Sequence, residues 1–426
     1  MTALLNEDVI NPVFAAAALR DDGAAGQLRN PHEIRKRARA LLARARAGES
    51  GQFTVHDAAL KDLTETLTDA IRRNRQEMSS SDADVHAKLD RLLGPAGFTG
   101  RIEKAERAEH ARAHVDLAFV TVLLQFEPEV DWEYHESSTG QVSTGLGGAA
   151  LAAFDAFTGG VFSSDPARPC QVDADGLRNL SGEALARAFQ LALSRQSRRL
   201  EDRVAFLRRI GETLSRQQGI FGPGLRPAGL FDSLSGAEQH EFAPTAEVGA
   251  HDILITLLMT LSPIWPAENT FGEHRLGDCW RLPAARGSGL TDGWMPLHRL
   301  GQALTYGLVR AFEHAGLPVR NIEALTPLAE PDGSGLLMDA GVLKPRSRWV
   351  SSPVADPAVV ELRALTVALT DELDAPVRRG LDDAYSAMPT AVMLGPEVWR
   401  SARLFHGGKT SQDVLAAPWN DEDPAL

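Results

Sequence analysis

Apolar residues recur at helical spacing along most of the chain. The first clear case is residues 30–48, whose apolar stripe consists of Ile34, Ala38, Leu41 and Leu42. Asn30 is placed to cap this helix, Pro31 suits its first position, and Gly48 can end it. We expect the arginines of this segment to lie on the opposite, solvated face.

The same spacing predicts further helices over residues 55–74 and 104–124, and one long helix or two helices across residues 181–217. In the last segment the core-facing stripe consists of Leu185, Phe189, Leu193, Val204, Leu207 and Leu214. Residues 219–231 are rich in Gly and Pro and predict a shaped loop. Short β elements are expected near residues 131–136 and 335–343, the second with the character of a hairpin or a short strand.

These elements predict a mainly α fold, a single large helical domain with a few short β elements. We place this domain at residues 20–412, with an N-terminal helical part at about 20–118, a core at about 119–412, and an acidic tail at 413–426. Since the sequence contains no internal repeat and no long low-complexity linker, one domain is the simpler interpretation.

Charge and composition narrow the class of partner. The chain of 426 residues has a formal net charge of −13, which argues against nucleic acid and against an anionic membrane surface, because both attract local excesses of Lys and Arg. We therefore expect a small-molecule partner; the oligomeric state is left open. The longest apolar run, ILITLLMTL from Ile253, is much shorter than a membrane-spanning helix of about 20 residues. Cys170 and Cys279 stand far apart with no second thiol nearby, and the N-terminus lacks a signal-peptide pattern, so a cytoplasmic protein is expected.

Familiar cofactor and metal motifs are incomplete. GLGGAA, from Gly145, fits a relaxed dinucleotide pattern, but no strand leads into it, which favours a close-packed helix entry. His110 and His114 share one helical face, but no third metal ligand is evident in the nearby sequence. RLFHGGKTS lacks the first glycine of a phosphate-binding loop. We therefore predict neither a cofactor nor a metal.

Acids beside aromatic residues in expected loops are the remaining candidates for chemistry. The residues of these groups are Trp132, Tyr134 and Glu136; Asp232; Trp265; Asp278, Trp280 and Arg281; His298, Gln302 and Tyr306; and Glu330 and Asp339. An apolar wall of tryptophan raises the pKa of a carboxyl group toward neutrality, which suits general acid catalysis. The alternative is structural: Asp278 caps a helix that begins near Trp280, and Glu330 holds a turn.

The order of these motifs resembles the uracil-catabolism Urc/Urg proteins of bacteria and fungi, long described as a domain of unknown function. The motifs that carry the resemblance are DWEYHESSTG, FDAFTGGVFSSDP, RPAGLFDSL, IWP, LGDCWR, PLHRLGQALTYGL, LTPLAEPDGSGLLMDAGVL and VVELRALTVALTDEL. The resemblance implies an enzyme of pyrimidine degradation that releases urea from a ribosyl or phosphoribosyl group. Such C–N cleavage needs a carboxylate near an oxocarbenium-like sugar and a proton for the departing nitrogen.

On this basis Asp278 and Glu330 are the expected catalytic acids, with Glu136 as a substitute. The expected substrate contacts are Tyr134, Asp232, Trp280, Arg281, His298, Gln302, Tyr306 and Asp339.

Several charged positions of the family pattern are changed. The basic stretch HSRWRHF corresponds here to HAKLDRL from His86, which weakens a phosphate clamp. Gln125 stands where the family has an aspartate, and Asp332 stands where the family has an arginine. Gly145 and Gly147 occupy positions at which the family has an arginine and a glutamate, respectively. The sequence thus predicts a divergent enzyme, with hydrolytic N-glycosidic or ureido C–N cleavage of a ribosylurea-like molecule as the first hypothesis. The alternatives are a non-catalytic ligand-binding or regulatory paralogue, a repurposed biosynthetic enzyme for a non-phosphorylated nucleoside-like substrate, and a nicotinamide-dependent enzyme.

Overall fold

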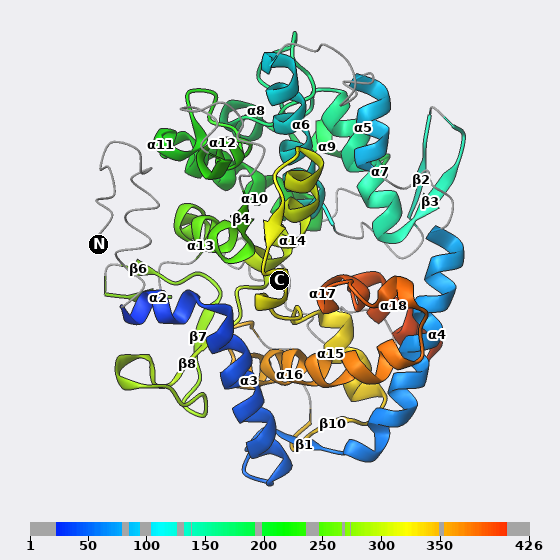
Figure 1. Cartoon of the computed structure of the whole chain (residues 1–426), viewed down its shortest axis with the longest axis vertical. Coiled ribbons are helices and arrows are strands. Elements are labelled where there is room, and N and C mark those ends of the chain that lie inside the picture. Colours follow the sequence, from blue (N-terminus) through cyan, green and yellow to red (C-terminus); the bar gives the residue numbers. More distant parts are fainter. Residues whose placement is uncertain are drawn as a thin grey trace, which may run out of the picture.

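The computed structural model describes residues 23–78, 85–93, 104–125, 132–137, 139–191, 198–235, 247–265, 269–272, 274–348 and 353–406. Over these ranges the chain is mainly α-helical with short two-stranded sheets, which confirms the predicted fold class (Figure 1). In these same ranges, every helix is too short or too polar to cross a membrane. The expected acidic tail and Leu193 lie outside the described residues.

The lower half of the molecule in Figure 1 combines the N-terminal and C-terminal helices of the described chain. Its helices are α2 (Ala24–Arg29), α3 (Pro31–Arg46), α4 (Leu60–Met78), α15 (Pro331–Asp339), α16 (Pro357–Arg379), α17 (Thr390–Met393) and α18 (Pro396–Phe405). Helix α16 is its central element, because most of its side chains from Val359 to Thr370 are buried. Leu41 of α3, Leu67 of α4 and Trp399 of α18 belong to the same apolar core as α16.

The upper half contains the middle of the chain around a second apolar core. Its helices are α5 (Val85–Leu93), α6 (Lys104–Leu123), α7 (Gly145–Thr158), α8 (Ala174–Arg178), α9 (Gly182–Ala188), α10 (Arg198–Ser215), α11 (Gln218–Phe221), α12 (Gly229–Ser235), α13 (Ala250–Thr260) and α14 (Arg299–His314). Helix α14 packs closely on α6: a Cβ atom at Gly307 would come within 2.6 Å of Val122 Cγ2. The strand before α14, Trp294–Pro296, lies in the lower half, so α14 links the two cores.

The strands form small separate sheets. The antiparallel pairs are β1 (Phe53–Val55) with β10 (Leu343–Pro345), β2 (Glu133–His135) with β3 (Val142–Thr144), β5 (Thr270–Phe271) with β6 (His274–Arg275), and β7 (Cys279–Arg281) with β8 (Trp294–Pro296). The parallel pair is β4 (Val248–Gly249) with β9 (Val319–Arg320). Short 3₁₀ turns are η1 (Asp57–Ala59), η4 (Ser262–Ile264), η5 (Gly289–Thr291), η6 (Ile322–Ala324) and η7 (Asp383–Tyr385).

Helix α3 confirms the prediction for its start and end but not for its polar face. The Asn30 side chain accepts a hydrogen bond from the backbone N–H of His32 at 2.9 Å, and Gly48 follows the helix at φ +78°. The expectation that all its arginines are solvated is wrong for Arg37, which is buried. Arg37 donates to the carbonyl oxygens of Thr291 and Trp294 at 2.8 and 2.7 Å. It therefore joins α3 to the loop before β8.

Other predicted boundaries need correction. The helix expected from residue 55 begins at Leu60, after β1 and η1. For residues 181–217, where one long helix or two were expected, the described residues contain two helices, α9 and α10. The loop expected at 219–231 is present only in the centre of that range, because α11 and α12 occupy the two ends of the range. The short strand expected at 335–343 is wrong for most of its length: Pro331–Asp339 is helix α15, and a strand begins only at Leu343. The glycines that suggested a turn there allow close packing instead, since a Cβ atom at Gly333 would lie 3.1 Å from the Trp399 ring.

Candidate active site

Asp278, in the turn before β7, is fully buried and its carboxylate is tightly held. Arg363 of α16 forms a paired contact with it, with Nη1–Oδ1 and Nη2–Oδ2 distances of 2.9 and 2.7 Å. The Trp280 indole donates to Oδ1 at 2.6 Å. Burial alone would raise the pKa of Asp278, but Arg363 and these hydrogen bonds hold it below its ordinary value. The expectation that a neighbouring indole raises the carboxyl pKa is therefore wrong here, because the indole is a donor.

Asp278 also organises the start of α14. Its Oδ2 accepts a hydrogen bond from the backbone N–H of Arg299 at 2.9 Å, and its carbonyl oxygen accepts from Leu297 and His298. The helix expected near Trp280 is wrong, since Cys279–Arg281 is strand β7. Asp278 thus caps a helix that lies about twenty positions later in the chain.

Arg299 connects Asp278 to Glu330. Its Nη2 lies 2.7 Å from Glu330 Oε2, while its backbone N–H binds Asp278. Glu330 immediately precedes α15 and is 3% exposed. Its second oxygen, Oε1, is buried and has no hydrogen-bond partner among the described residues. A buried carboxylate with one held oxygen and one available acceptor is a feature of sites that receive a polar ligand.

Asp332 provides a second carboxyl group one half-turn further along α15. It faces Arg403 of α18 at 3.4 Å, and Arg403 also contacts Asp339 at 2.8 Å. Burial raises the pKa of Asp332 to about 6, the Arg403 guanidinium opposes this shift, and the Glu330 charge adds to it. Near neutral pH this group therefore exchanges a proton readily.

Arg203 of α10 adds a further positive charge from the upper half. It is buried, and burial together with the neighbouring Arg299 lowers its pKa to about 10. We call the group formed by Arg203, Arg299, Glu330, Asp332 and Arg403 the Arg299–Glu330 site. Charge interactions link Arg203 to Arg299 and Asp332 to Glu330, and direct contacts join Arg299 to Glu330 and Arg403 to Asp332.

Several predicted contact residues surround this site as packing and hydrogen-bonding groups. His298 is buried against the carbonyl of Leu28, with Nε2 at 2.9 Å, and burial lowers its pKa. Gln302 Nε2 contacts Thr326 Oγ1 at 2.9 Å, and the Tyr306 hydroxyl donates to the Thr326 carbonyl at 3.2 Å. These contacts attach the loop before α15 to α14.

Tyr134 and Glu136 belong to a different cluster, beside α5 and α7 in the upper half (Figure 1). Glu136 pairs with Lys88 at 2.5 Å and accepts from Thr139 at 2.6 Å. The Tyr134 hydroxyl donates to Asp155, and burial raises the pKa of the tyrosine. The structure thus brings Asp278 and Glu330 together and places Glu136 elsewhere.

Two other predicted residues are also separate. Asp232 pairs with Arg112 at 2.8 Å and lines a cleft of about 480 Å³. Arg281 stacks on the Trp294 ring, with its guanidinium carbon 3.8 Å from the ring centre.

A cleft of about 940 Å³ runs along the second half of α14. Tyr306 lines it, together with His86, Gln125 and Arg310. Gln125 is one of the positions that depart from the family pattern. Tyr306 therefore connects this cleft, through Thr326 and Gln302, to the loop that carries Glu330.

Sequence reasoning missed Asp332 as an acid of this site, and it missed the arginines around the acids, which are Arg203, Arg299, Arg363 and Arg403. Arg299 and Arg363 lie inside the quoted motifs, and Arg363 stands in the apolar run VVELRALTVAL. An arginine within an apolar helix is almost always paired, and this was the available signal.

Comparison with known proteins agrees with the motif order. Residues 27–413 match a family model described as "Protein of unknown function (DUF1688)". "Protein urg3" of Schizosaccharomyces pombe is 28% identical over 386 residues, which cover 88% of this chain and 91% of that protein. "Uracil catabolism protein 4" of Lachancea kluyveri is 28% identical over 391 residues, which cover 84% of this chain and 88% of that protein.

Proposed function

The chain belongs to the family described as "Protein of unknown function (DUF1688)", and from that premise we propose that it is an enzyme of pyrimidine catabolism. The proposed reaction is hydrolytic cleavage of a C–N bond in a ribosylurea-like small molecule. The name of the relative "Uracil catabolism protein 4" supports the metabolic context. The chemistry of the Arg299–Glu330 site supports the reaction class.

The observation that carries the proposal is the state of Glu330. Its carboxylate is buried, one oxygen is held by Arg299 at 2.7 Å, and the other has no hydrogen-bond partner among the described residues. A carboxylate in this state can stabilise positive charge on a sugar ring as the glycosidic bond breaks. Because Arg299 holds it in place, little reorganisation is required.

Asp332 is the proposed proton donor for the departing nitrogen. With a pKa raised to about 6, it retains its proton closer to neutral pH than an ordinary aspartic acid. Asp278 has no such role in this proposal, because its carboxylate is occupied by Arg363, Trp280 and Arg299. We assign it as a positioning residue that fixes Arg299 and, through Arg299, Glu330.

The test is a ligand screen followed by product analysis. Thermal unfolding is measured with ribosylurea, uridine and their phosphates, and urea release is assayed for each compound that raises Tm. We expect turnover of a ribosylurea-type compound by the wild-type protein and a loss of about 10²–10⁴-fold in Glu330→Gln. Glu65→Gln, which changes an exposed glutamate of α4, is the matched control and retains activity.

Two results would contradict the proposal. Stabilisation by a ligand with no product would support the ligand-binding paralogue instead. Full activity in a folded Glu330→Gln variant would remove Glu330 from the mechanism.

A further inference from the structure

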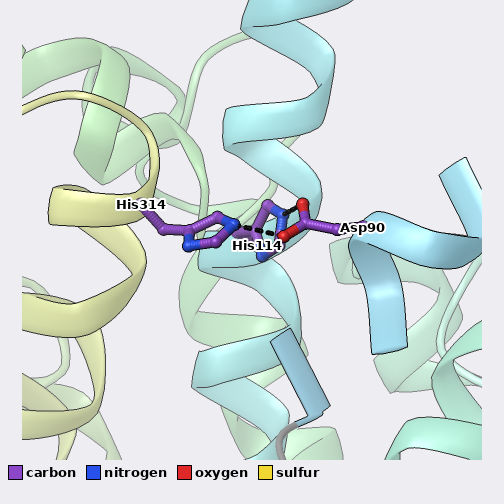
Figure 2. Close-up of side chains that lie close together, drawn as sticks. All are labelled: Asp90, His114 and His314. Carbon is purple, nitrogen blue, oxygen red and sulfur yellow. Dashed lines mark hydrogen bonds and ion pairs between the residues drawn. The ribbon is translucent and has the colours of Figure 1, made fainter. Parts of the chain in front are cut away.

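A second cluster of chemically reactive side chains lies at the opposite end of α14. Asp90 of α5, His114 of α6 and His314, the last residue of α14, point toward one another (Figure 2). Asp90 Oδ1 lies 3.0 Å from His114 Nε2, and Asp90 Oδ2 lies 2.6 Å from His314 Nε2. The three potential ligand atoms all lie within 4.8 Å of one another. Two consecutive helices, α5 and α6, and the distant helix α14 therefore converge on one point.

The position of His114 suits a metal ligand. His114 is buried, so packing holds its ring in place beside Asp90 and His314. A neutral imidazole nitrogen binds metal ions through its lone pair. The Asp90 carboxylate supplies the negative charge.

His86 provides the supporting contact that metal-bound histidines usually have. Its Nδ1 lies 2.9 Å from His114 Nδ1, on the side of the ring opposite Asp90. One of these two nitrogens donates and the other accepts. When His114 Nδ1 carries the proton, Nε2 presents its lone pair toward Asp90 and His314, and the ring orientation is fixed.

We propose that Asp90, His114 and His314 bind a divalent transition-metal ion of the zinc class. Two imidazole nitrogens and one carboxylate oxygen form a common ligand set for Zn²⁺, whereas Mg²⁺ and Ca²⁺ favour oxygen ligands alone. A tetrahedral ion with bonds of about 2.0–2.1 Å separates its ligand atoms by about 3.3 Å. His114 Nε2 and His314 Nε2 each lie within 3.0 Å of one Asp90 oxygen, and one ligand atom of each residue lies within 4.8 Å of the others. Modest side-chain movements would therefore bring three ligand atoms to this separation.

The exposure of the cluster leaves room for a fourth ligand. The side chains of Asp90 and His314 are 43% and 36% exposed, whereas that of His114 is 3% exposed. Three protein ligands with one solvent-facing position is the arrangement of metal sites that bind water or a small molecule. His86 also lines the cleft of about 940 Å³, so the site lies directly behind the wall of that cleft.

The sequence indicated only His110 and His114 as a possible metal pair. His110 lies outside the cluster, and the other two members, Asp90 and His314, come from other helices. His314 lies 200 positions from His114, so nearby sequence contained no signal for it.

The test measures metal binding by the full-length, tag-free protein after removal of metals with a chelator. We expect the wild-type chain to bind one Zn²⁺, to gain thermal stability on binding, and to give the visible absorption of tetrahedral Co²⁺ when Co²⁺ is substituted. His314→Ala and Asp90→Asn, both at half-exposed positions, should lose all three signals while retaining the helical circular dichroism of the wild type. His86→Ala should weaken Zn²⁺ binding by about 10–100-fold.

The matched control is His406→Ala, which removes an exposed histidine at the end of α18. It should bind Zn²⁺ like the wild type. Absence of binding by the wild-type protein would overturn the proposal, and so would equal binding by all of the variants. Neither result would affect the proposal for Glu330, which is tested by urea release.

Discussion

Two aspartates within the same region show how the immediate partners of a carboxyl group decide its pKa. Asp278 and Asp332 are both shielded from solvent, and in both cases burial raises the pKa. Asp278 faces a paired guanidinium at 2.7–2.9 Å and two further donors, so its net pKa is lowered. Asp332 has a longer contact to Arg403 and a negative neighbour in Glu330, so its pKa remains raised. Identical side chains are thus suited to different tasks, one to positioning and one to proton exchange.

The raised pKa of Asp332 predicts a pH-dependent cost to stability. An aspartate with a pKa of 3.8 in the unfolded chain and about 6 in the folded chain is protonated preferentially in the folded state. Its contribution to stability is therefore greatest at or below pH 4 and is lost as the pH rises toward 6. Asp332→Asn lacks this titration. We expect the free energy of unfolding of Asp332→Asn minus that of the wild type, both measured by urea unfolding, to increase by up to about 3 kcal/mol between pH 4 and pH 6.5. A constant difference across this range would contradict the assignment.

The burial of the Asp278–Arg363 pair predicts a large effect of its removal. Asp278→Asn leaves the Arg363 guanidinium buried without its counter-ion, and such changes destabilise proteins by about 3–5 kcal/mol. The comparison is Asp69→Asn, which breaks an exposed pair with Arg72 and should change stability by less than about 0.5 kcal/mol. Urea unfolding at pH 7 measures both. Equal, small effects would show that Asp278 does not anchor α14.

At the scale of single elements, α3 shows that arginines of the same helix can have different roles, one structural and one solvated. Arg37 is buried and binds two backbone carbonyls and the Thr291 hydroxyl, whereas Arg39 is mostly exposed beside Asp371. Arg37→Ala removes the donors for several buried acceptors at once and should destabilise the protein by about 3–5 kcal/mol. Arg39→Ala should have an effect below about 0.5 kcal/mol. Thermal and urea unfolding of the two variants, whose positions lie two residues apart on α3, would separate these roles. Similar effects from both would contradict the structural assignment of Arg37.

The elements that the sequence predicts correctly are those whose local signals agree. In α3 the cap at Asn30, the proline at the first position, the apolar stripe and the final glycine all indicate the same boundaries. In α15 the signals conflict, because Gly333 and Gly335 suggest a turn. Their structural reason is tertiary: both allow α18 to approach closely, with Trp399 over one and Arg403 over the other. Spacing along the chain does not contain this information.

The candidate site was predictable only in part: Glu330 was expected, whereas Asp332 was noted only as a change from the family pattern and the arginines were missed. Glu330 and Asp278 stand next to turn signals and aromatic residues, which singled them out. Their partners Arg299 and Arg363 are separated from them by 31 and 85 positions, and pairing over such distances depends on how the helices pack. The grouping of Glu136 with Asp278 fails for the same reason.

At the scale of the whole molecule, α14 joins the two largest apolar cores of the described residues (Figure 1). The first residue of this helix is held by Asp278 in the lower half, and its buried face from Leu300 to Phe312 belongs to the upper core. The Arg299–Glu330 site lies at its first turn, and the Asp90–His114–His314 cluster lies at its last. A single rigid helix therefore sets the separation between the two proposed sites.

The two cysteines offer a direct test of how firmly this junction is held. Cys279 is fully buried with Leu28, Leu276 and Trp294, at the contact between α2 and strands β7 and β8. Burial, and then the Asp278 charge, raises its thiol pKa, so the reactive thiolate is scarce in the folded state. Cys170 is only partly buried at the edge of the upper core, and burial raises its pKa as well.

We therefore predict that a thiol reagent labels Cys170 of the native protein first and Cys279 only when the junction opens. Peptide mapping by mass spectrometry after timed labelling measures the two rates separately. Because labelling of Cys279 requires the contacts around Asp278 to separate, its rate should match that of global unfolding. In Asp278→Asn the rate at Cys279 should rise strongly, while the rate at Cys170 should change little if the upper core remains intact. Labelling of Cys279 as fast as Cys170 in the wild-type protein would show that the first turn of α14 is not held by the network around Asp278, and the positioning role assigned to that residue would fail with it.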